Sequence, residues 1–254
     1  MGRVAIGLAG SLALAGCPAA STQVPARLYV AASGAEFAQR LLDRTELPRW
    51  QVSLGSSSVL ARQIAAGAPA DVLLCANRTW VDWLSERGHL RGEPIELGWN
   101  HAVFAAGDER ADSPPPGSLA ELVRRLEPDQ RLAIGDPGVP VGDLARTALA
   151  EAGVLADLEP HLVGFPDAGA VLRAVERGAV FGGFPFHTDA SRADLEVAFR
   201  LSGRAALLAC ELRDSEHPAR ARELLSHLGT QASKTLLAEL GFAPAGARAG
   251  QSQR

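Results

Sequence analysis

Three short loops of small residues stand where an apolar strand-like run gives way to an amphipathic helix-like run. A helix that begins directly after such a loop exposes backbone N–H groups without intrahelical partners and carries a partial positive charge, so it can hold an anion without a counter-ion. Serine hydroxyls add donors that rotate toward a ligand, and small residues let the backbone come close. Taken singly, each serine is equally consistent with an ordinary helix N-cap. The loops are Ala32-Ser33-Gly34, Gly55-Ser56-Ser57-Ser58 and Val139-Pro140-Val141-Gly142.

The elements that must position these loops alternate along the chain, which is typical of an α/β layer fold. The apolar runs predict strands at 27–31, 50–54, 70–75, 95–106, 132–134 and 180–184, and one more within 200–211. Helices are expected to begin at Ser33, after Ser58, at Thr79, near Leu119, near Asp143 and after Asp167, with two more between residues 218 and 245. Asp, Ser and Pro are frequent at 108–117, which indicates a surface loop just past a domain boundary.

Length and composition bound the class of protein. The 254 residues fit one large domain or two modest lobes, and 47% hydrophobic residues are enough for a packed core. The formal net charge of −4 argues against a nucleic-acid partner, since a surface that binds a phosphate backbone needs clustered positive charge. No Cys/His cluster supports a metal site.

The N-terminus has the pattern of an export signal. Arg3 precedes an apolar stretch from Val4 to Ala15, which is too short to span a bilayer as a mature helix. It ends in Leu14-Ala15-Gly16-Cys17, which resembles the bacterial lipobox. That resemblance implies a signal over residues 1–17, lipidation of Cys17, and a tether over 18–26. The alternative is an ordinary signal that is cut near Ala19 or Ala20 and discards Cys17.

From about residue 28 to 243 the chain resembles the periplasmic molybdate-binding proteins of ABC transporters, which are bacterial extracellular solute-binding proteins. The resemblance is carried by ordered motifs along nearly the whole mature chain. They are Ala32-Ser33, the block SSSVLARQIAAGAPADVLL at 56–74, LAIGDP at 132–137 followed by VPVG at 139–142, Asp167, AVERG at 174–178, Asp189-Ala190 and LGF at 240–242.

The resemblance implies a type II periplasmic-binding-protein fold, in which each lobe is a mixed, mostly parallel sheet flanked by helices and the ligand lies in the cleft between lobes. The first lobe is expected at 27–98 and again at 199–254, with the second lobe inserted at 99–198. Ser33 and Ser57 match two serine ligands in the first lobe, while Val141 and Ala168 match positions that donate backbone N–H groups. The fifth ligand is usually a tyrosine hydroxyl, and the matching residue here is Phe186.

The resemblance further implies capture of molybdate or tungstate for an ABC importer, with no cofactor and no catalysis. The protein is expected to be a monomer, anchored by lipid on the periplasmic side of the membrane, with a membrane permease as its partner. Because Phe186 has no hydroxyl, the same fold with a different oxyanion or small anionic solute remains an alternative. A secreted hydrolase is a remote alternative, since no Gly-x-Ser-x-Gly elbow is present.

Five other residues have two interpretations each. Cys75 and Cys210 lie in apolar runs and read as core residues, although export would permit a disulfide between them. Trp80 and Trp83 have helical spacing and are expected in the core rather than in an aromatic box. His187 is either a compensating donor to the anion or an exposed loop histidine.

Overall fold

The computed structural model describes residues 24–47, 49–107 and 114–245. The predicted signal, the predicted lipobox with Cys17, and most of the predicted tether lie outside these residues. Within the described ranges, no helix combines the length and the apolar character that crossing a bilayer requires.

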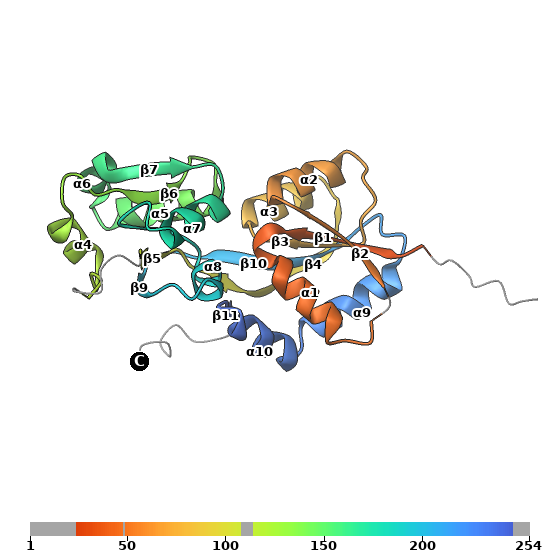
Figure 1. The fold of residues 1–254 in the computed structure, drawn as a ribbon. Helices are drawn as coiled ribbons and strands as arrows, with labels where there is room; N and C mark the ends of the chain where they lie inside the picture. Colours follow the sequence, from red (N-terminus) through yellow and green to blue (C-terminus); the bar gives the residue numbers. More distant parts are fainter. Residues whose placement is uncertain (1–23, 48, 108–113, 246–254) are drawn as a thin grey trace, which may run out of the picture.

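The strands of the described residues form two sheets, one in each of two lobes (Figure 1). The first sheet has six strands in the order β11-β4-β10-β3-β1-β2: β1 (Ala26–Ala31), β2 (Trp50–Gly55), β3 (Val72–Cys75), β4 (Leu90–Asn100), β10 (Ala205–Leu212) and β11 (Ala243–Pro244). The second sheet has five strands in the order β7-β6-β8-β5-β9: β5 (Val103–Ala106), β6 (Leu132–Gly135), β7 (Leu162–Phe165), β8 (Gly182–Gly183) and β9 (Val197–Arg200).

Each sheet combines parallel and antiparallel pairings. The neighbours β2, β1 and β3 are parallel, as are β7, β6 and β8, whereas β4 with β10 and β5 with β9 pair antiparallel. The expectation of a mostly parallel sheet is therefore wrong for the part of the first sheet that holds β4 and β10 and for the part of the second sheet that holds β5 and β9. The reason lies in the connection between the lobes, because the chain leaves the first lobe along β4 and β5 and returns along β9 and β10, so the outgoing and returning strands run in opposite directions.

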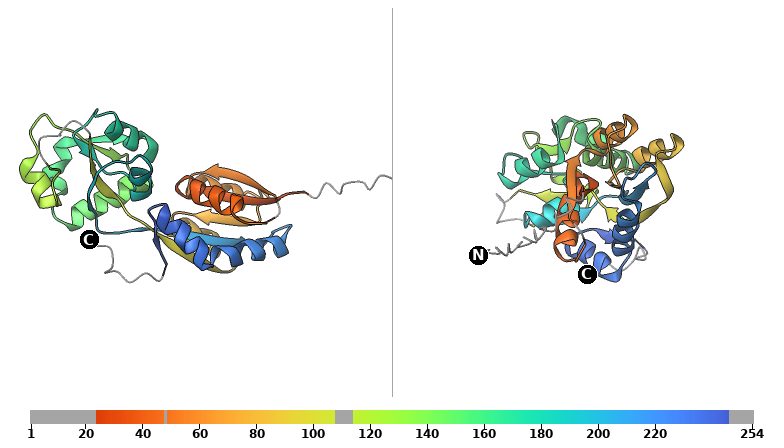
Figure 2. Two further views of the ribbon diagram at one scale, coloured as in Figure 1. Left: turned by 60° about the horizontal axis from the view of Figure 1, so that its bottom comes forward. Right: turned by 90° about the vertical axis from the view of Figure 1, so that its right-hand side faces the viewer.

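Helices cover both faces of the first sheet, as the alternation of side chains along its strands requires. Leu28 and Val30 point to one face, which is covered by α1 (Ala35–Asp43), α9 (Pro218–Leu228) and α10 (Gln231–Glu239). Tyr29 and Leu73 point to the other face, which is covered by α2 (Ser57–Ala65) and α3 (Arg78–Glu86). Figure 2 shows these two layers on either side of the sheet.

The second sheet is covered in the same way. On one face, α5 (Pro140–Glu151) packs on the sheet with α4 (Leu119–Arg125), α6 (Leu155–Leu158) and the short η2 (Glu159–His161) near it, and on the other face lies α7 (Ala168–Glu176). The remaining helix, α8 (His187–Arg192), contacts β5 and β9. Leu132 and Ile134 face α5, whereas Ala133 faces α7.

The structure interrupts the strand that was predicted over 95–106. This strand is divided into β4 and β5 at His101 and Ala102, and Ala102 makes an isolated bridge with Phe186. The chain thus changes sheet between Asn100 and Val103, and again between Arg200 and Ala205. The predicted lobe boundaries after residues 98 and 198 stay predictions, and the changes of sheet lie just beyond them.

Other differences have local causes. The helix predicted near Asp143 begins at Pro140, where a proline fits because the first helical N–H has no partner to lose. The strand predicted over 180–184 is reduced to Gly182–Gly183. The elements α6, β7, α8 and β9 were not predicted, and each of them has only four or six residues.

Candidate functional site

The carboxyl ends of β1, β2 and β3 meet at one edge of the first sheet. The strands are parallel, with Ala31 opposite Gly55 and Val30 opposite Leu74 in the register. The segments that follow them are the 3₁₀ turn η1 (Ala32–Gly34) before α1, the start of α2, and the start of α3. Helix N-termini therefore gather at this edge, with their unpaired N–H groups beyond the sheet.

Ser33 lies in the 3₁₀ turn between β1 and α1 and is partly exposed. A helix was predicted to begin at this serine, and it does so as a tight turn that becomes α-helical at Ala35. Gly34 is buried behind it, and a Cβ on this glycine would lie 3.2 Å from Leu207 Cδ1. Among the described residues, the Ser33 hydroxyl has no hydrogen-bond partner, so it is available to a ligand.

The three serines before α2 have different roles. Ser56 is the N-cap, because its Oγ accepts a hydrogen bond from Val59 N at 3.3 Å. Ser57 is buried, its Oγ accepts from Ala76 N at 3.2 Å, and its hydroxyl also hydrogen-bonds the Cys75 thiol group beneath it. Ser58 Oγ lies 3.1 Å from Ser56 Oγ and 3.5 Å from Arg62 Nη2. The predicted ligand Ser57 is thus the serine that the fold fixes most firmly.

The loop after β3 was not predicted as part of the site. Asn77 caps α3 by accepting from Thr79 N at 2.9 Å, and Ala76 holds Ser57 as described above. Cys75 lies beneath this loop, and its Sγ contacts the Asn77 carbonyl at 3.2 Å. Burial raises the pKa of the Cys75 thiol, against hydrogen bonds with Ser57 and Asn77 that lower it. In the sequence, the signal that could have indicated this helix cap is an Asn two residues before a Thr, directly after a buried strand.

In the second lobe, the backbone at the start of α5 packs directly on the end of β6. Val141 is fully buried, so its side chain belongs to the second-lobe core while its N–H lies in the first turn of the helix. A Cβ on Gly142 would overlap the Gly135 backbone, which explains the glycine at both positions. Asp143 Oδ1 accepts from Gly138 N at 2.9 Å and folds the preceding loop back on the helix.

Ala168 is the first residue of α7, as the predicted cap at Asp167 requires. Asp167 Oδ1 accepts from Ala170 N at 2.7 Å, which confirms the predicted N-cap. The β6 and β7 strands are parallel with Gly135 opposite Phe165, and Asp136 N donates to Phe165 O at 2.8 Å. The N-termini of α5 and α7 are therefore neighbours at this edge, just as those of α1 and α2 are in the first lobe.

Phe186 belongs to the same second-lobe core cluster as Val141, and Ala168 packs against that cluster. The ring of Phe186 is buried in this cluster, and it contributes no donor in place of a tyrosine hydroxyl. Both expectations for His187 are wrong, since it begins α8 rather than lying in an exposed loop. Its ring nitrogens contact Gly241 O at 2.7 Å and Arg200 Nη2 at 3.3 Å, so neither is free for an anion.

The structure thus places Ser33 with Ser57 at one edge and Val141 with Ala168 at another. In Figure 1, β1 runs toward the second lobe and β7 runs toward the first, so that the two edges face each other. The donors are hydroxyls and backbone N–H groups, which suit an oxyanion. Among the described residues, no group of three or more His, Cys, Asp or Glu side chains is placed to hold a metal ion. Cys75 and Cys210 are buried free thiols in the core, as predicted.

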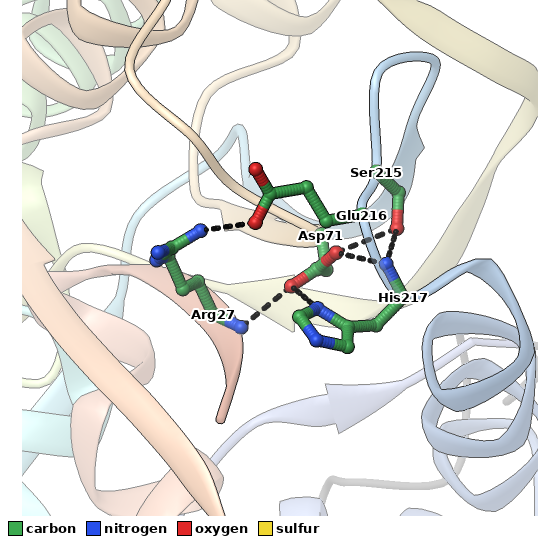
Figure 3. Close-up of polar contacts among 5 residues, drawn as sticks. All are labelled: Arg27, Asp71, Ser215, Glu216 and His217. Carbon is green, nitrogen blue, oxygen red and sulfur yellow. Dashed lines mark hydrogen bonds and ion pairs between the residues drawn. The ribbon is translucent and has the colours of Figure 1, made fainter. Parts of the chain in front are cut away.

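A second polar cluster lies at the opposite end of the first sheet (Figure 3). Asp71, nearly fully buried before β3, accepts from Ser215 Oγ at 2.6 Å, Arg27 N at 2.7 Å and His217 N at 2.9 Å, and its Oδ2 lies 3.2 Å from His217 Nδ1. Burial alone would raise the pKa of Asp71, but these hydrogen bonds together lower it below its usual value. Because the Ser215 proton points to the carboxylate and not to the imidazole, the cluster is not arranged for nucleophilic attack.

The chain crosses between the lobes twice, at 100–103 and at 200–205, and helix N-termini lie on the facing edges of the lobes. This is the architecture of a binding protein that holds its ligand between domains. The chain belongs to the family described as bacterial extracellular solute-binding protein, which matches residues 28–243. This family acts outside the cytoplasm. The family match and the two-lobed fold confirm the class of protein that the motifs predicted.

Comparisons with individual proteins agree with the family. The chain is 29% identical over 206 residues to the molybdate-binding protein of Haemophilus influenzae, covering 75% of this chain and 77% of that protein. The structure matches the substrate-binding domain of a putative molybdenum ABC transporter from Clostridium difficile with a TM-score of 0.73 at 21% identity, over 87% of this chain and 99% of that one. It also matches a sulfate-binding protein from Mycobacterium tuberculosis with a TM-score of 0.69 at 15% identity, over 89% and 88% of the two chains. At these identities the two structures show the fold alone.

Proposed function

We propose that this protein captures molybdate, or the similar dianion tungstate, between its lobes and delivers it to an ABC importer without changing it chemically. The observation that carries the proposal is the placement of four predicted donor positions at the starts of helices that follow parallel strands. Ser33 and Ser57 come from one lobe, and Val141 and Ala168 come from the other. The similarity to the Haemophilus influenzae molybdate-binding protein supports the choice of ligand.

The mechanism follows from the separation of the donors. Neither edge alone surrounds a tetrahedral anion, so the ligand gains its full set of hydrogen bonds only when the lobes close around it. Ligand binding then stabilises the closed form by the difference in its affinity for the two forms. We propose that the closed form docks on a membrane permease as a monomer.

The measurement that tests this function is the thermal midpoint of the full chain at pH 7.5 with molybdate, tungstate, sulfate or phosphate. A ligand that binds only the folded state adds about 2.7 kcal/mol at a hundredfold excess over Kd. The proposal expects a rise with molybdate and tungstate and none with sulfate, since a cage sized for the larger anions leaves its donors too far from sulfate. A rise with sulfate alone would show that the protein shares the fold of molybdate-binding proteins but not their ligand.

Phe186 supports the alternative that the chain binds another oxyanion. One hydrogen bond to a charged ligand contributes about 1.5–3 kcal/mol, or roughly 10- to 100-fold in Kd. Phe186→Tyr should strengthen molybdate binding by that factor if the hydroxyl reaches the anion. Phe184→Tyr is the control, because Phe184 is also buried in the second-lobe core and matches no ligand position. An unchanged affinity in both variants would show that the anion is held without the fifth ligand.

We also propose that Cys17 carries a lipid that holds the protein on the periplasmic side of the membrane. The lipobox sequence is the support for this proposal. In the native host, the wild-type protein should partition into the detergent phase of Triton X-114, whereas Cys17→Ala should not. Equal partitioning of both would contradict the anchor and favour a signal that is cut beyond Cys17.

A further inference from the structure

Helix α8 of the second lobe contacts the first lobe beside the two crossings. His187 Nδ1 lies 2.7 Å from the carbonyl oxygen of Gly241, in the turn after α10. Asn100, at the end of β4, donates from Nδ2 to Thr188 Oγ1 at 2.9 Å, and both side chains are buried. Gly241 has a φ of +85°, and a Cβ there would lie 3.0 Å from His187 Nδ1. The turn therefore needs glycine both for its conformation and for the approach of the imidazole.

The hydrogen bonds fix where the proton of the His187 ring lies. A carbonyl oxygen can only accept, so Nδ1 carries the proton and donates it to Gly241. In the neutral ring Nε2 is then an acceptor, and Arg200 Nη2 lies 3.3 Å from it. Arg200 is the last residue of β9, where the chain leaves the second lobe. The ring thus joins α8 to both the first lobe and the returning crossing, and it does so only while Nε2 is unprotonated.

The outgoing crossing is tied into the same arrangement. His187 N donates to the carbonyl oxygen of His101 at 2.8 Å, in the segment between β4 and β5. The His101 ring in turn contacts the Gly203 carbonyl at 3.1 Å through Nδ1, in the segment between β9 and β10. The two crossings and α8 are therefore linked by hydrogen bonds, and two imidazoles lie within the links.

The charged groups around His187 are mainly cationic on the side of the crossings. Burial lowers the pKa of His187, the Gly241 hydrogen bond opposes this, and Arg200 lowers the pKa further. Burial also lowers the pKa of His101, as do Arg200, His187 and Arg204, against the Gly203 hydrogen bond.

On α8 itself, Asp189 pairs with Arg192 at 3.2 Å, and the pKa of Asp189 is raised above its usual value because the effect of burial outweighs that of Arg192. Burial raises the Asp189 pKa, with a smaller contribution from Glu36 of α1. Asp189 is thus already paired, and acidic residues on the neighbouring elements include Glu36 on α1, Glu176 on α7 and Glu239 at the end of α10. Protonation of the His187 imidazole therefore places a positive charge beside the cationic groups at the crossings.

We propose that His187 is a proton-sensitive link where the two lobes join, which holds the returning crossing at Arg200 while neutral and releases it when Nε2 takes up a proton, with the Nδ1 bond to Gly241 kept. The proton from solvent occupies the lone pair that accepts from Arg200, so that hydrogen bond is lost and two cations become neighbours. The contact of α8 with the returning crossing is then weakened, whereas the bond from Nδ1 to the Gly241 carbonyl in the first lobe is kept. The equilibrium between lobe orientations shifts in acid, in a protein whose proposed function depends on lobe closure.

The test measures the lobes directly, without ligand. Fluorophores at Ser85→Cys on α3 and Asp157→Cys on α6, both exposed, report the distance between the lobes in the full chain with Cys17→Ala, where Cys75 and Cys210 are buried. The transfer efficiency should change as the pH falls from 7.5 to 4.5, with a midpoint below 6.5, the usual value for histidine. A constant efficiency over this range would overturn the proposal.

Three variants assign the change to His187. His187→Asn keeps a donor where Nδ1 donates to Gly241, and His187→Gln keeps an acceptor toward Arg200, and neither titrates in this range. Both should abolish the pH response, and a response that persists in either folded variant would overturn the proposal. Arg200→Met should move the midpoint upward because it removes the neighbouring cation, and an unmoved midpoint would contradict the pairing.

His101→Asn is the control for the other imidazole and should keep the response, since its loss would assign the proton to His101 instead. The molybdate-dependent thermal shift at pH 7.5 is a separate measurement, so this proposal and the proposed function can fail independently. If both hold, the affinity for molybdate should change with the same midpoint as the distance between the lobes.

Discussion

The two ends of the first sheet hold similar polar groups, but they differ in how many of these groups have partners within the protein. At the amino end, Asp71 is buried and accepts hydrogen bonds from Ser215, from His217 and from the backbone of Arg27. At the carboxyl end, Ser33 has no partner among the described residues and Ser57 accepts a single hydrogen bond, from Ala76 N. Both ends use the same kinds of groups. The difference is that one end satisfies them internally and the other leaves donors for a ligand.

This difference follows from the direction of the parallel strands. Helices begin where parallel strands end, so the unpaired N–H groups of α1, α2 and α3 all lie at the carboxyl edge. The amino edge receives the chain as it returns from helices and from β10, and its loops must be closed without a ligand. A buried carboxylate closes them, because one anion can accept several N–H and O–H groups from separate segments. Stability and binding should therefore be separable by substitutions at the two ends.

The largest expected effect is at the amino end. Asp71→Ala leaves donors from Arg27, Ser215 and His217 without their acceptor, and removal of one partner from a buried charged network costs about 3–5 kcal/mol. Urea unfolding should show this loss, while calorimetry on the folded protein should give an unchanged affinity for molybdate. A matched loss of affinity would show that the amino end also positions the ligand.

The same carboxylate makes stability depend on pH in the acid range. The pKa of Asp71 is lower in the folded protein than the 3.8 of an unfolded aspartate, so the unfolded state binds more protons as the pH falls. Its contribution to stability is fully present above that value and is lost as the pH falls through the folded pKa. Asp71→Asn should flatten the curve of unfolding free energy against pH below pH 4, measured by urea titration. A curve parallel to that of wild type would contradict this assignment.

At the carboxyl end of the first sheet, a substitution should weaken ligand binding more than it lowers stability. Ser57→Ala removes a hydroxyl that donates to a charged ligand, so the Kd for molybdate should rise by roughly 10- to 100-fold. Its loss of stability should be about 1 kcal/mol, since the hydroxyl also accepts from Ala76 N. Ser85→Ala, on the exposed face of α3, is the matched control and should change neither quantity. If Ser57→Ala changed stability alone, the predicted serine would be structural.

The sequence predicted the helix starts at the candidate site of the second lobe well because helix starts have local signals. Asp167 caps α7 as expected, and the proline and glycine around Val141 mark the start of α5 within three residues. The loop at Ala76 and Asn77 was missed because its importance depends on β3 lying beside β1, and pairing between distant strands has no local signal. The amino-end cluster was missed for the same reason, since Asp71 and Ser215 are 144 positions apart.

The break in the predicted strand over 95–106 has the same explanation. Residues 100–103 contain no proline or glycine that would end a strand, and only the presence of a second lobe makes the chain change sheet there. The role of His187 depends on Gly241, 54 positions away. Its type and neighbours in sequence therefore left open both an anion donor and an exposed loop residue.

The smallest expected effect comes from a charged residue at the amino end of the first sheet that is exposed and not buried. Glu216 pairs with Arg27 at 2.8 Å beside the Asp71 cluster, but its side chain is 59% exposed. An exposed ion pair contributes about 0.2–1 kcal/mol, because water already solvates both partners. Glu216→Gln should therefore lower the unfolding free energy by no more than that amount, and added salt should reduce the difference. A loss as large as that of Asp71→Ala would mean that the amino end is stabilised by its net charge and not by the buried acceptor.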